Sequence, residues 1–267
     1  MNPSSDTPTF RISEDERLDE INEHLRLIQK KNGLTFGTDA YLLAAFARHM
    51  SSARAVDLGS GTGIIPFLLL SKNKIASAVA VEIQPAFAEL IERNAELNGL
   101  CDRITPLCAD LRTLSAHTLG CEFDLVTANP PYMRCDSGKR NVHDEKYIAR
   151  HEVCGGIEDF CSAAARLLKH GGRFLTVWRP DRLSELFSAL HAAKLAPKRM
   201  TVVYADTQSE PCVVLTEAVK GASPAMRVTP PLILYRPLTE KNGKARRLTE
   251  DAQAVYDHCR FPDSFYQ

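Results

Sequence analysis

The chain has 267 residues, of which 44% are hydrophobic and 25% charged, and this is the composition of an ordinary soluble globular protein. Its 33 basic and 33 acidic side chains balance, so no global charge attracts nucleic acid. No stretch reaches the roughly 18 uncharged apolar residues of a membrane span, and the N-terminus lacks the features of a secretory signal. We therefore expect a cytoplasmic protein with no membrane association. The eight scattered cysteines, none in a C-x-x-C pair, predict reduced thiols and no metal site.

Two helical segments are predicted ahead of the main fold. Residues 1–10, rich in Ser, Thr, Pro and Asp, are expected to be disordered. Residues 13–30 carry apolar side chains at three- and four-residue spacings with an acidic first turn, which predicts an amphipathic helix. The segment "YLLAAFARHM" predicts a second, mostly buried helix that is capped by Thr38 or Asp39.

From residue 53 onwards, short apolar runs alternate with helical segments. The runs are "ARAVDLG", "SAVAVEI", "RITPLCAD", "CEFDLVTAN" and "GRFLTVW". This alternation predicts a parallel sheet covered by helices on both faces, which is a doubly wound, Rossmann-like α/β fold. After a helix at 181–193, two strands joined by a short polar link predict an antiparallel hairpin at the sheet edge, giving seven strands. "PPLILYRPL" is a candidate for one more edge strand.

A glycine-rich turn follows the first predicted strand of the sheet. In "VDLGSGTGIIPFLLL", Asp57 precedes Gly59, Gly61 and Gly63. Glycines let a backbone approach a ligand closely, but a dinucleotide loop would need glycine at position 64, and no phosphate-binding Gly-Lys-Ser/Thr follows. Asp57 would repel a pyrophosphate and attract a cationic amino group. The spacing resembles the D-x-G-x-G-x-G motif of class I methyltransferases, which use S-adenosylmethionine as methyl donor.

Acidic side chains also end the next two predicted strands. Glu82 is placed to accept both hydroxyls of a ribose, and Asp110 to accept from an adenine amino group, with Leu111 offering its backbone N–H. Three acids at the ends of three consecutive strands, all at the carboxyl edge where such sheets bind ligands, predict a nucleoside site.

The fourth predicted strand ends in Asn129, Pro130, Pro131 and Tyr132. An exocyclic aromatic amine is a poor nucleophile because its lone pair is delocalised into the ring. The Asn129 side-chain oxygen and the Pro130 carbonyl can accept both amine hydrogens, which favours a pyramidal nitrogen aimed at the methyl donor. The prolines rigidify that carbonyl, and Tyr132 offers a face on which a base stacks. We therefore expect Asn129, Pro130 and Tyr132 to be catalytic.

The motif resembles that of amino methyltransferases acting on adenine N6, cytosine N4, guanine N2 or the glutamine amide. The flanks "GLTFGTDAYLLAAFA" and "YIARHE", and more loosely the tail "PPLILY…LTED" with Leu248 in place of the usual Tyr, are similar to bacterial tRNA(Val) adenine N6-methyltransferases over roughly residues 30–260. The resemblance implies a tRNA substrate and a donor site that also involves Thr38, Asp39 and Asn129. It divides the chain into an N-terminal segment (1–50), a methyltransferase core (51–220) and a basic extension of the same domain (221–267).

Several points stay open at the level of sequence. A release-factor glutamine methyltransferase, a ribosomal guanine N2-methyltransferase and a catalytically silent RNA-binding module are the alternatives, and the chain could be a monomer or a homodimer. RNA binding by a chain of zero net charge needs a local basic surface. The candidate residues for that surface are Lys139, Arg140, Lys241, Lys244, Arg246 and Arg247.

Overall fold

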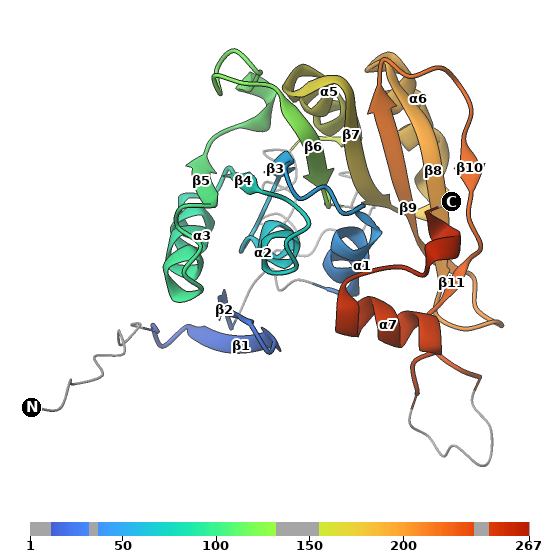
Figure 1. The fold of residues 1–267 in the computed structure, drawn as a ribbon, viewed down its shortest axis with the longest axis horizontal. Helices are drawn as coiled ribbons and strands as arrows, with labels where there is room; N and C mark the ends of the chain where they lie inside the picture. Colours follow the sequence, from blue (N-terminus) through green and yellow to red (C-terminus); the bar gives the residue numbers. More distant parts are fainter. Residues whose placement is uncertain (1–11, 32–36, 132–154, 238–245, 267) are drawn as a thin grey trace, which may run out of the picture.

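The computed structural model describes residues 12–31, 37–131, 155–237 and 246–266, and Figure 1 shows their arrangement. The tail at residues 1–10 lies outside them. Within the described chain, a nine-stranded sheet runs in the order β10-β8-β9-β7-β6-β3-β4-β5, and β11 also pairs with β8. Its strands are β3 (Arg54–Leu58), β4 (Ser77–Glu82), β5 (Ile104–Cys108), β6 (Phe123–Ala128), β7 (Leu168–Trp178), β8 (Leu195–Tyr204), β9 (Pro211–Lys220), β10 (Arg227–Val228) and β11 (Leu232–Ile233).

The sheet confirms the predicted doubly wound α/β class. Strands β3 to β7 pair parallel to one another, and β9 is antiparallel to both of its neighbours, β7 and β8. These are the seven predicted strands, including the antiparallel hairpin. The short strands β10 and β11 line the outer edge of β8, and β11 lies in the segment proposed as an edge strand. The opposite edge strand, β5, contains Pro106.

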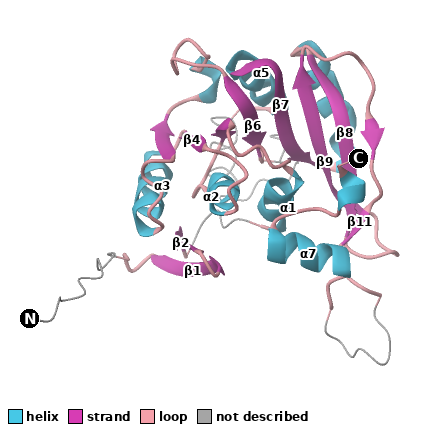
Figure 2. Cartoon of the chain, viewed as in Figure 1, coloured by secondary structure: helices cyan, strands magenta, loops and turns pink. Residues whose placement is uncertain are grey.

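Helices cover both faces of the sheet, as Figure 2 shows. They are α1 (Thr38–Phe46), α2 (Ile64–Ser71), α3 (Pro85–Leu97), α5 (Ile157–Leu167), α6 (Leu183–Ala192) and α7 (Glu250–His258), with 3-10 turns η1 (Leu111–Thr113), η2 (Pro180–Arg182) and η4 (Asp263–Phe265). None of these described helices is long and apolar enough to cross a membrane.

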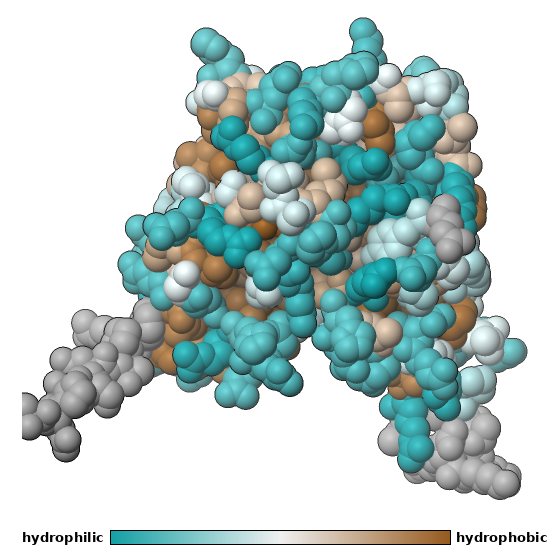
Figure 3. Space-filling view, in the orientation of Figure 1, coloured by the Kyte–Doolittle hydropathy of each residue, from teal (hydrophilic) through white to brown (hydrophobic). Residues whose placement is uncertain are grey.

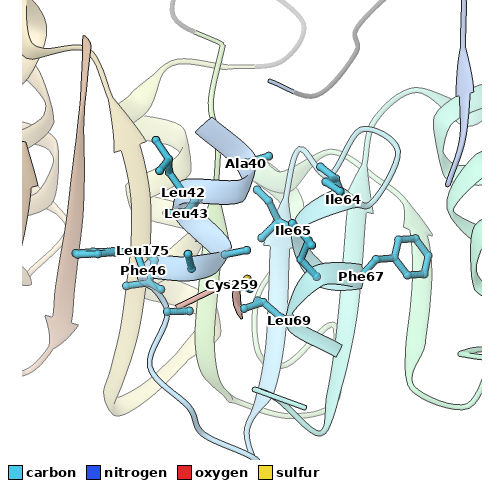
Figure 4. Close-up of a cluster of buried hydrophobic side chains, with 14 of the residues drawn as sticks. Ala40, Leu42, Leu43, Phe46, Ile64, Ile65, Phe67, Leu69, Leu175 and Cys259 are labelled. Carbon is cyan, nitrogen blue, oxygen red and sulfur yellow. The ribbon is translucent and has the colours of Figure 1, made fainter. Parts of the chain in front are cut away.

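Two large hydrophobic clusters form the core, one on each face of the sheet, and a small third cluster packs Ile28 against Phe87 and Leu90 of α3. Helices α1, α2 and α7 bury side chains such as Leu42, Phe46 and Ile65 in one cluster, part of which is drawn in Figure 4. Helices α5 and α6 bury Phe160 and Leu190 in the other. Successive side chains of a strand point to opposite faces, so each central strand contributes to both clusters. On the face seen in Figure 3, the hydrophobic areas that remain are small and separated by hydrophilic side chains.

The prediction of a helix at residues 13–30 is wrong. This segment forms an antiparallel hairpin of β1 (Glu16–Asn22) and β2 (Leu25–Lys30), which is separate from the main sheet. Leu25 and Leu27 are buried on either side of exposed Arg26, which is the two-residue alternation of a strand, and Ile28 is buried as well, against Phe87 and Leu90 of α3. The apolar spacing of the segment therefore fits both a helix and a strand, and contacts elsewhere in the chain decide between them.

Those contacts come from Asn94 of α3 and from Asn98, the C-cap residue of that helix. Asn94 accepts a hydrogen bond from the Ile28 N–H (2.7 Å) and donates to the Ile28 carbonyl (3.2 Å). The Asn98 side chain likewise accepts a hydrogen bond from the Arg26 N–H (3.0 Å) and donates to the Arg26 carbonyl (2.7 Å). The two carboxamides thus take the place of a neighbouring strand for the outer edge of β2. An extended backbone exposes these groups to a partner, whereas a helix would use them internally.

Candidate active site

The carboxyl edge of the sheet gathers most of the residues that the motifs predict. The carboxyl ends of parallel strands share one edge. Asp57 lies in the last two residues of β3 and the glycine turn follows that strand, Glu82 ends β4, Asp110 and Leu111 follow β5, and Asn129 and Pro130 follow β6. Five predicted residues lie outside the described part of the chain, namely Tyr132, Lys139, Arg140, Lys241 and Lys244.

The glycine turn leads directly into α2. Gly63 is the N-cap of α2 and has a φ of 85°, and a Cβ placed there would come within 2.7 Å of the Phe67 ring. Gly61 also has a positive φ, 56°, but a Cβ there would meet no atom within 4 Å. Packing therefore requires glycine at position 63, while position 61 leaves its backbone open to a ligand.

Asp57 lies under this turn and joins it to the neighbouring strand. Its side chain is buried, and its two oxygens accept hydrogen bonds from the hydroxyls of Ser60 (2.6 Å) and Thr127 (2.5 Å). Burial raises the pKa of Asp57 to about 7, while the two hydroxyls oppose the shift and nearby Glu82 adds to it. Through these two hydrogen bonds, Asp57 links the glycine turn to β6. The predicted attraction between the Asp57 charge and a cationic ligand stays a prediction.

Glu82 is the second acid of the edge, and it also contacts the turn. It is 5% exposed. One carboxylate oxygen accepts the Gly61 N–H (2.9 Å), and the other accepts the Gln84 N–H (3.0 Å). A carboxylate offers about four lone-pair sites, so capacity remains for ligand hydroxyls. The hydrogen bonds orient Glu82 beside the open backbone at Gly61.

Asp110 is more exposed than the other two acids and has a partner of its own. It is the N-cap of η1 and accepts the Arg112 N–H (2.9 Å). The Arg112 guanidinium binds both carboxylate oxygens, and this hydrogen bonding holds the pKa of Asp110 below its ordinary value. An adenine amino group would therefore share Asp110 with Arg112. Leu111, the next residue, is buried at the start of η1.

Asn129 and Pro130 stand between the glycine turn and β7. Leu58 of β3 pairs with Ala128 of β6, so Asn129 follows β6 at the level where the glycine turn follows β3. Ala128 pairs on its other side with Thr176 of β7. Asn129 is half-buried and Pro130 is buried. Both residues thus lie at the centre of the edge.

A pocket of about 660 Å³ opens on the far side of β7. It is lined by the following eight residues: Asp39, Arg179, Pro180, Asp181, Glu210, Pro211, Cys212 and Val213. These residues come from the first turn of α1, the segment after β7 and the start of β9. Three carboxylates face one guanidinium there, and Arg179 is already paired with Asp181 (2.8 Å). The pocket therefore favours groups with hydrogens to donate over phosphates.

The predicted caps of α1 are wrong. The N-cap is Gly37, with no side-chain hydrogen bond, and Thr38 and Asp39 are the first helical residues. Thr38 hydrogen-bonds instead to Tyr256 of α7. Asp39 lines the pocket beside β7, and its negative charge suits the first turn of a helix.

The functional groups therefore follow one another in a fixed order along the carboxyl edge of the sheet. Acids and the open glycine turn occupy β5, β4 and β3, Asn129 and Pro130 occupy β6, and the pocket follows at β7 and β9. Neighbouring strands are about 4.8 Å apart, so a ligand at β3 and another at β7 would meet at Asn129.

Two predicted basic residues lie further along the same edge. Arg246 and Arg247 are exposed, and the Arg246 guanidinium lies 5.4 Å from the centre of the Tyr235 ring. Tyr235 donates its N–H to the Ala205 carbonyl just after β8 (2.8 Å). In the part of the chain that the structure describes, no three His, Cys, Asp or Glu side chains group as ligands for a metal ion.

Sequence reasoning missed the pocket residues beside β7. Arg179, Asp181 and Glu210 belong to no motif. Arg179 directly follows a predicted strand, Asp181 begins the helix predicted at 181–193, and Glu210 begins a predicted strand of the hairpin. Their position relative to β7 and β9 is a signal that could have found them, given the hairpin topology. Thr127 was also missed, and its strand register opposite Asp57 is not readable from the sequence.

Comparison with known proteins agrees with this geometry. Residues 30–194 match the methyltransferase small domain family. A Porphyromonas gingivalis protein named tRNA1(Val) (adenine(37)-N6)-methyltransferase is 30% identical over 187 residues, which cover 68% of this chain and 72% of that protein. A Bacteroides fragilis protein of the same name is 32% identical over 178 residues, covering 65% and 72%. The crystal structure of a predicted O-methyltransferase from Agrobacterium tumefaciens shares the fold, with a TM-score of 0.66 and 21% identity over 84% of this chain and 98% of that one. The chain belongs to the methyltransferase small domain family and is a relative of the tRNA1(Val) adenine N6-methyltransferases.

Proposed function

We propose that this methyltransferase transfers a methyl group from S-adenosylmethionine to an exocyclic amine of tRNA, namely adenine N6 in the anticodon loop of tRNA(Val) in the cytoplasm. The observation that carries the proposal is the order along the carboxyl edge. Groups suited to a nucleoside with a cationic side chain lie on one side of Asn129, and a pocket suited to an amine-bearing base lies on the other.

The donor side has the chemistry that S-adenosylmethionine requires. Gly61 leaves open space over its backbone, and Glu82 is held beside it with lone pairs left for ribose hydroxyls. Asp110 and the start of η1 stand where an adenine would lie, and Arg112 would share the carboxylate with it. When bound, S-adenosylmethionine supplies an electrophilic methyl group.

The acceptor side uses Asn129 and Pro130. The Asn129 carboxamide oxygen and the Pro130 carbonyl would accept the two hydrogens of the amine, so its lone pair would turn away from the ring. The pocket beside β7 would hold the rest of the base. Carboxylates in that pocket disfavour phosphates, so a base rather than the RNA backbone would enter.

Two further features support RNA as the substrate. The relatives from Porphyromonas gingivalis and Bacteroides fragilis are named for methylation of adenine 37 in tRNA1(Val). Arg246 and Arg247 are exposed at the same edge, beyond the pocket, where they would meet the phosphates that flank an inserted base. A loop nucleotide is unstacked at modest cost, which suits an enzyme that must extract its base.

The test is methyl transfer from labelled donor to unmodified tRNA(Val), release factor or ribosomal RNA, with the product identified by mass spectrometry. We expect N6-methyladenosine in the tRNA. Asn129→Ala should lower the transfer rate by at least about 100-fold and leave donor affinity within about threefold, because the carboxamide acts on the amine. Asn22→Ala, a change to a surface asparagine of the N-terminal hairpin, is the matched control.

Two results would contradict the proposal. Methylation of release factor or of guanine N2, with none on tRNA adenine, would reassign the substrate. Failure of the wild-type protein to bind S-adenosylmethionine in calorimetry, with RNA binding intact, would indicate an RNA-binding module without catalytic activity.

A further inference from the structure

A second pocket lies where helices α1, α2 and α7 end. It has a volume of about 600 Å³, and six basic side chains line it, namely Arg48, His49, Lys72, Lys74, His258 and Arg260. Asp263 is the acid in the lining. From this charge and position, we propose that the pocket binds backbone phosphates of the RNA substrate, away from the nucleotide that is methylated. The proposal rests on the proposed function.

The pocket is separated from the active-site edge by the length of α1. The helix begins with Asp39 in its first turn at the carboxyl edge and ends at Phe46, just before Arg48. Nine residues at about 1.5 Å each span roughly 14 Å. At the far end, the Met50 N–H donates to the Lys74 carbonyl, and the Ala53 N–H, just before β3, donates to the Met50 carbonyl. The pocket therefore lies towards the amino ends of the strands, and Figure 1 shows α1, α2 and α7 grouped together.

Part of the positive charge serves the protein itself. Lys74 is buried and donates to three carbonyls at the end of α1, those of Ala44, Ala45 and Ala47 (2.9, 3.0 and 2.7 Å). Burial lowers the pKa of Lys74 to about 8, so the side chain is still largely protonated at neutral pH. Lys72 donates to the Asp257 carbonyl near the end of α7 (3.3 Å). These lysines complement the negative ends of the helices.

The positive charge of the pocket lining exceeds the negative charge of the helix ends that it neutralises. Three helix C-termini together present roughly one and a half negative charges, at about half a charge each. Two arginines and two lysines less Asp263 leave three positive charges, before any contribution from His49 and His258. Arg48 also lies 3.6 Å from the buried carboxylate of Glu217, but Arg173 and Arg199 bind the same carboxylate and more than balance its charge. The excess is therefore about one to two positive charges, which attracts a phosphate. Arg260 is exposed and pairs with Asp263 on the rim, so its guanidinium can turn to an incoming anion.

RNA backbone is the anion that fits the position of the pocket. A double-stranded nucleic acid carries about one charge for each 1.7 Å of its axis. An RNA that delivers one base to the pocket at β7 and extends along α1 would therefore bring phosphates over Lys72 and Arg260. The two pockets have opposite character, because the one beside β7 is lined by three carboxylates. A base would enter the acidic pocket, and phosphates would settle on the basic one.

The test is the double variant Lys72→Glu/Arg260→Glu, which changes two rim side chains outside the active-site edge. Binding of unmodified tRNA(Val) is measured by fluorescence anisotropy over a range of salt concentrations. We expect affinity to fall at least about tenfold, and the slope of log K against log salt to become shallower by about 0.7 to 0.9 for each phosphate that the variant no longer binds. The methylation rate at saturating tRNA should stay within about twofold of wild type. Lys72→Ala/Arg260→Ala gives the same test with a smaller perturbation, should charge reversal impair folding.

The matched control is Lys31→Glu/Lys194→Glu, which makes the same change in net charge at two exposed lysines outside the pocket. An equal loss of affinity in the control, or unchanged affinity and salt slope in the pocket variant, would overturn the proposal. Inorganic phosphate is titrated by calorimetry as a separate arm. Phosphate binding with unchanged RNA affinity in the pocket variant would identify a site for free anions and refute an RNA contact. Because the assay measures binding, it gives a result even if methyl transfer to tRNA fails.

Discussion

The buried carboxylate of Asp57 should make the stability of the protein depend on pH in a way that Asp57→Asn removes. Burial raises the pKa of Asp57 from an ordinary 3.8 to about 7, so in the folded protein this group keeps a proton that the unfolded chain has already released. Between pH 4 and 7 the folded state binds more protons than the unfolded state. The contribution is fully present below pH 3.8 and is lost as the pH rises through 7.

The size of the effect follows from the shift. A rise of about three pKa units corresponds to about 4 kcal/mol in total, at 1.36 kcal/mol per unit. Over the practical interval from pH 5 to pH 7, linkage between these two pKa values gives a loss of about 2 kcal/mol in the free energy of unfolding. Other titrating groups, including the histidines, are common to both proteins and cancel in the comparison.

The assay is urea unfolding of the wild type and Asp57→Asn at pH 5, 6, 7 and 8. The free energy of unfolding of the wild type should fall relative to the variant by about 2 kcal/mol from pH 5 to pH 7. A constant offset from altered hydrogen bonds to Ser60 and Thr127 does not affect this comparison. Asp102→Asn, at an exposed carboxylate, is the matched control. Parallel pH profiles for wild type and Asp57→Asn would refute the assignment of a proton to Asp57.

Two further changes test the turn and the hairpin. Gly63→Ala should lower the free energy of unfolding by at least about 2 kcal/mol, because φ is 85° and the new methyl group meets the Phe67 ring at 2.7 Å. Gly61→Ala meets no atom, so it should cost only about 1 to 2 kcal/mol from its backbone angle and should mainly weaken donor binding. Thermal unfolding measures the stability of both variants, and calorimetry measures their donor binding. Asn94→Ala should lower the free energy of unfolding by about 2 to 4 kcal/mol, because it leaves the N–H and carbonyl of Ile28 without their partner. Amide hydrogen exchange in β2 should become faster for the same reason. An unchanged exchange rate would contradict the role given to α3.

The central α/β fold was predictable because its signals are local. Each strand from β3 to β7 is a short apolar run followed by a helical segment, and glycine or proline marks the turns. The N-terminal hairpin was not predictable in the same way. Its spacing fits two periods, and the choice depends on Asn94 and Asn98, which are more than 60 residues away along the chain.

The candidate site likewise contains residues that the sequence predicted and residues that it could not predict. The acids, the glycines and Asn129 were found because each follows a recognisable strand, and parallel topology alone then brings them to one edge. The partners that orient these side chains could not be found, since they depend on register: Thr127 faces Asp57, and the Gly61 N–H meets Glu82, only once the strands are aligned. Each of the two pockets joins segments that are far apart along the chain, which no local pattern reveals.

The two margins of the sheet have a consequence for self-association. Along β8, the short strands β10 and β11 already take up its outer hydrogen-bonding groups at two places. On the other side, β5 has five residues, and Pro106 among them lacks an N–H to donate. Neither margin offers a long, flat template, so copies of the protein are protected against joining their sheets into one. A dimer of this enzyme would have to form through a surface other than these two edges of the main sheet.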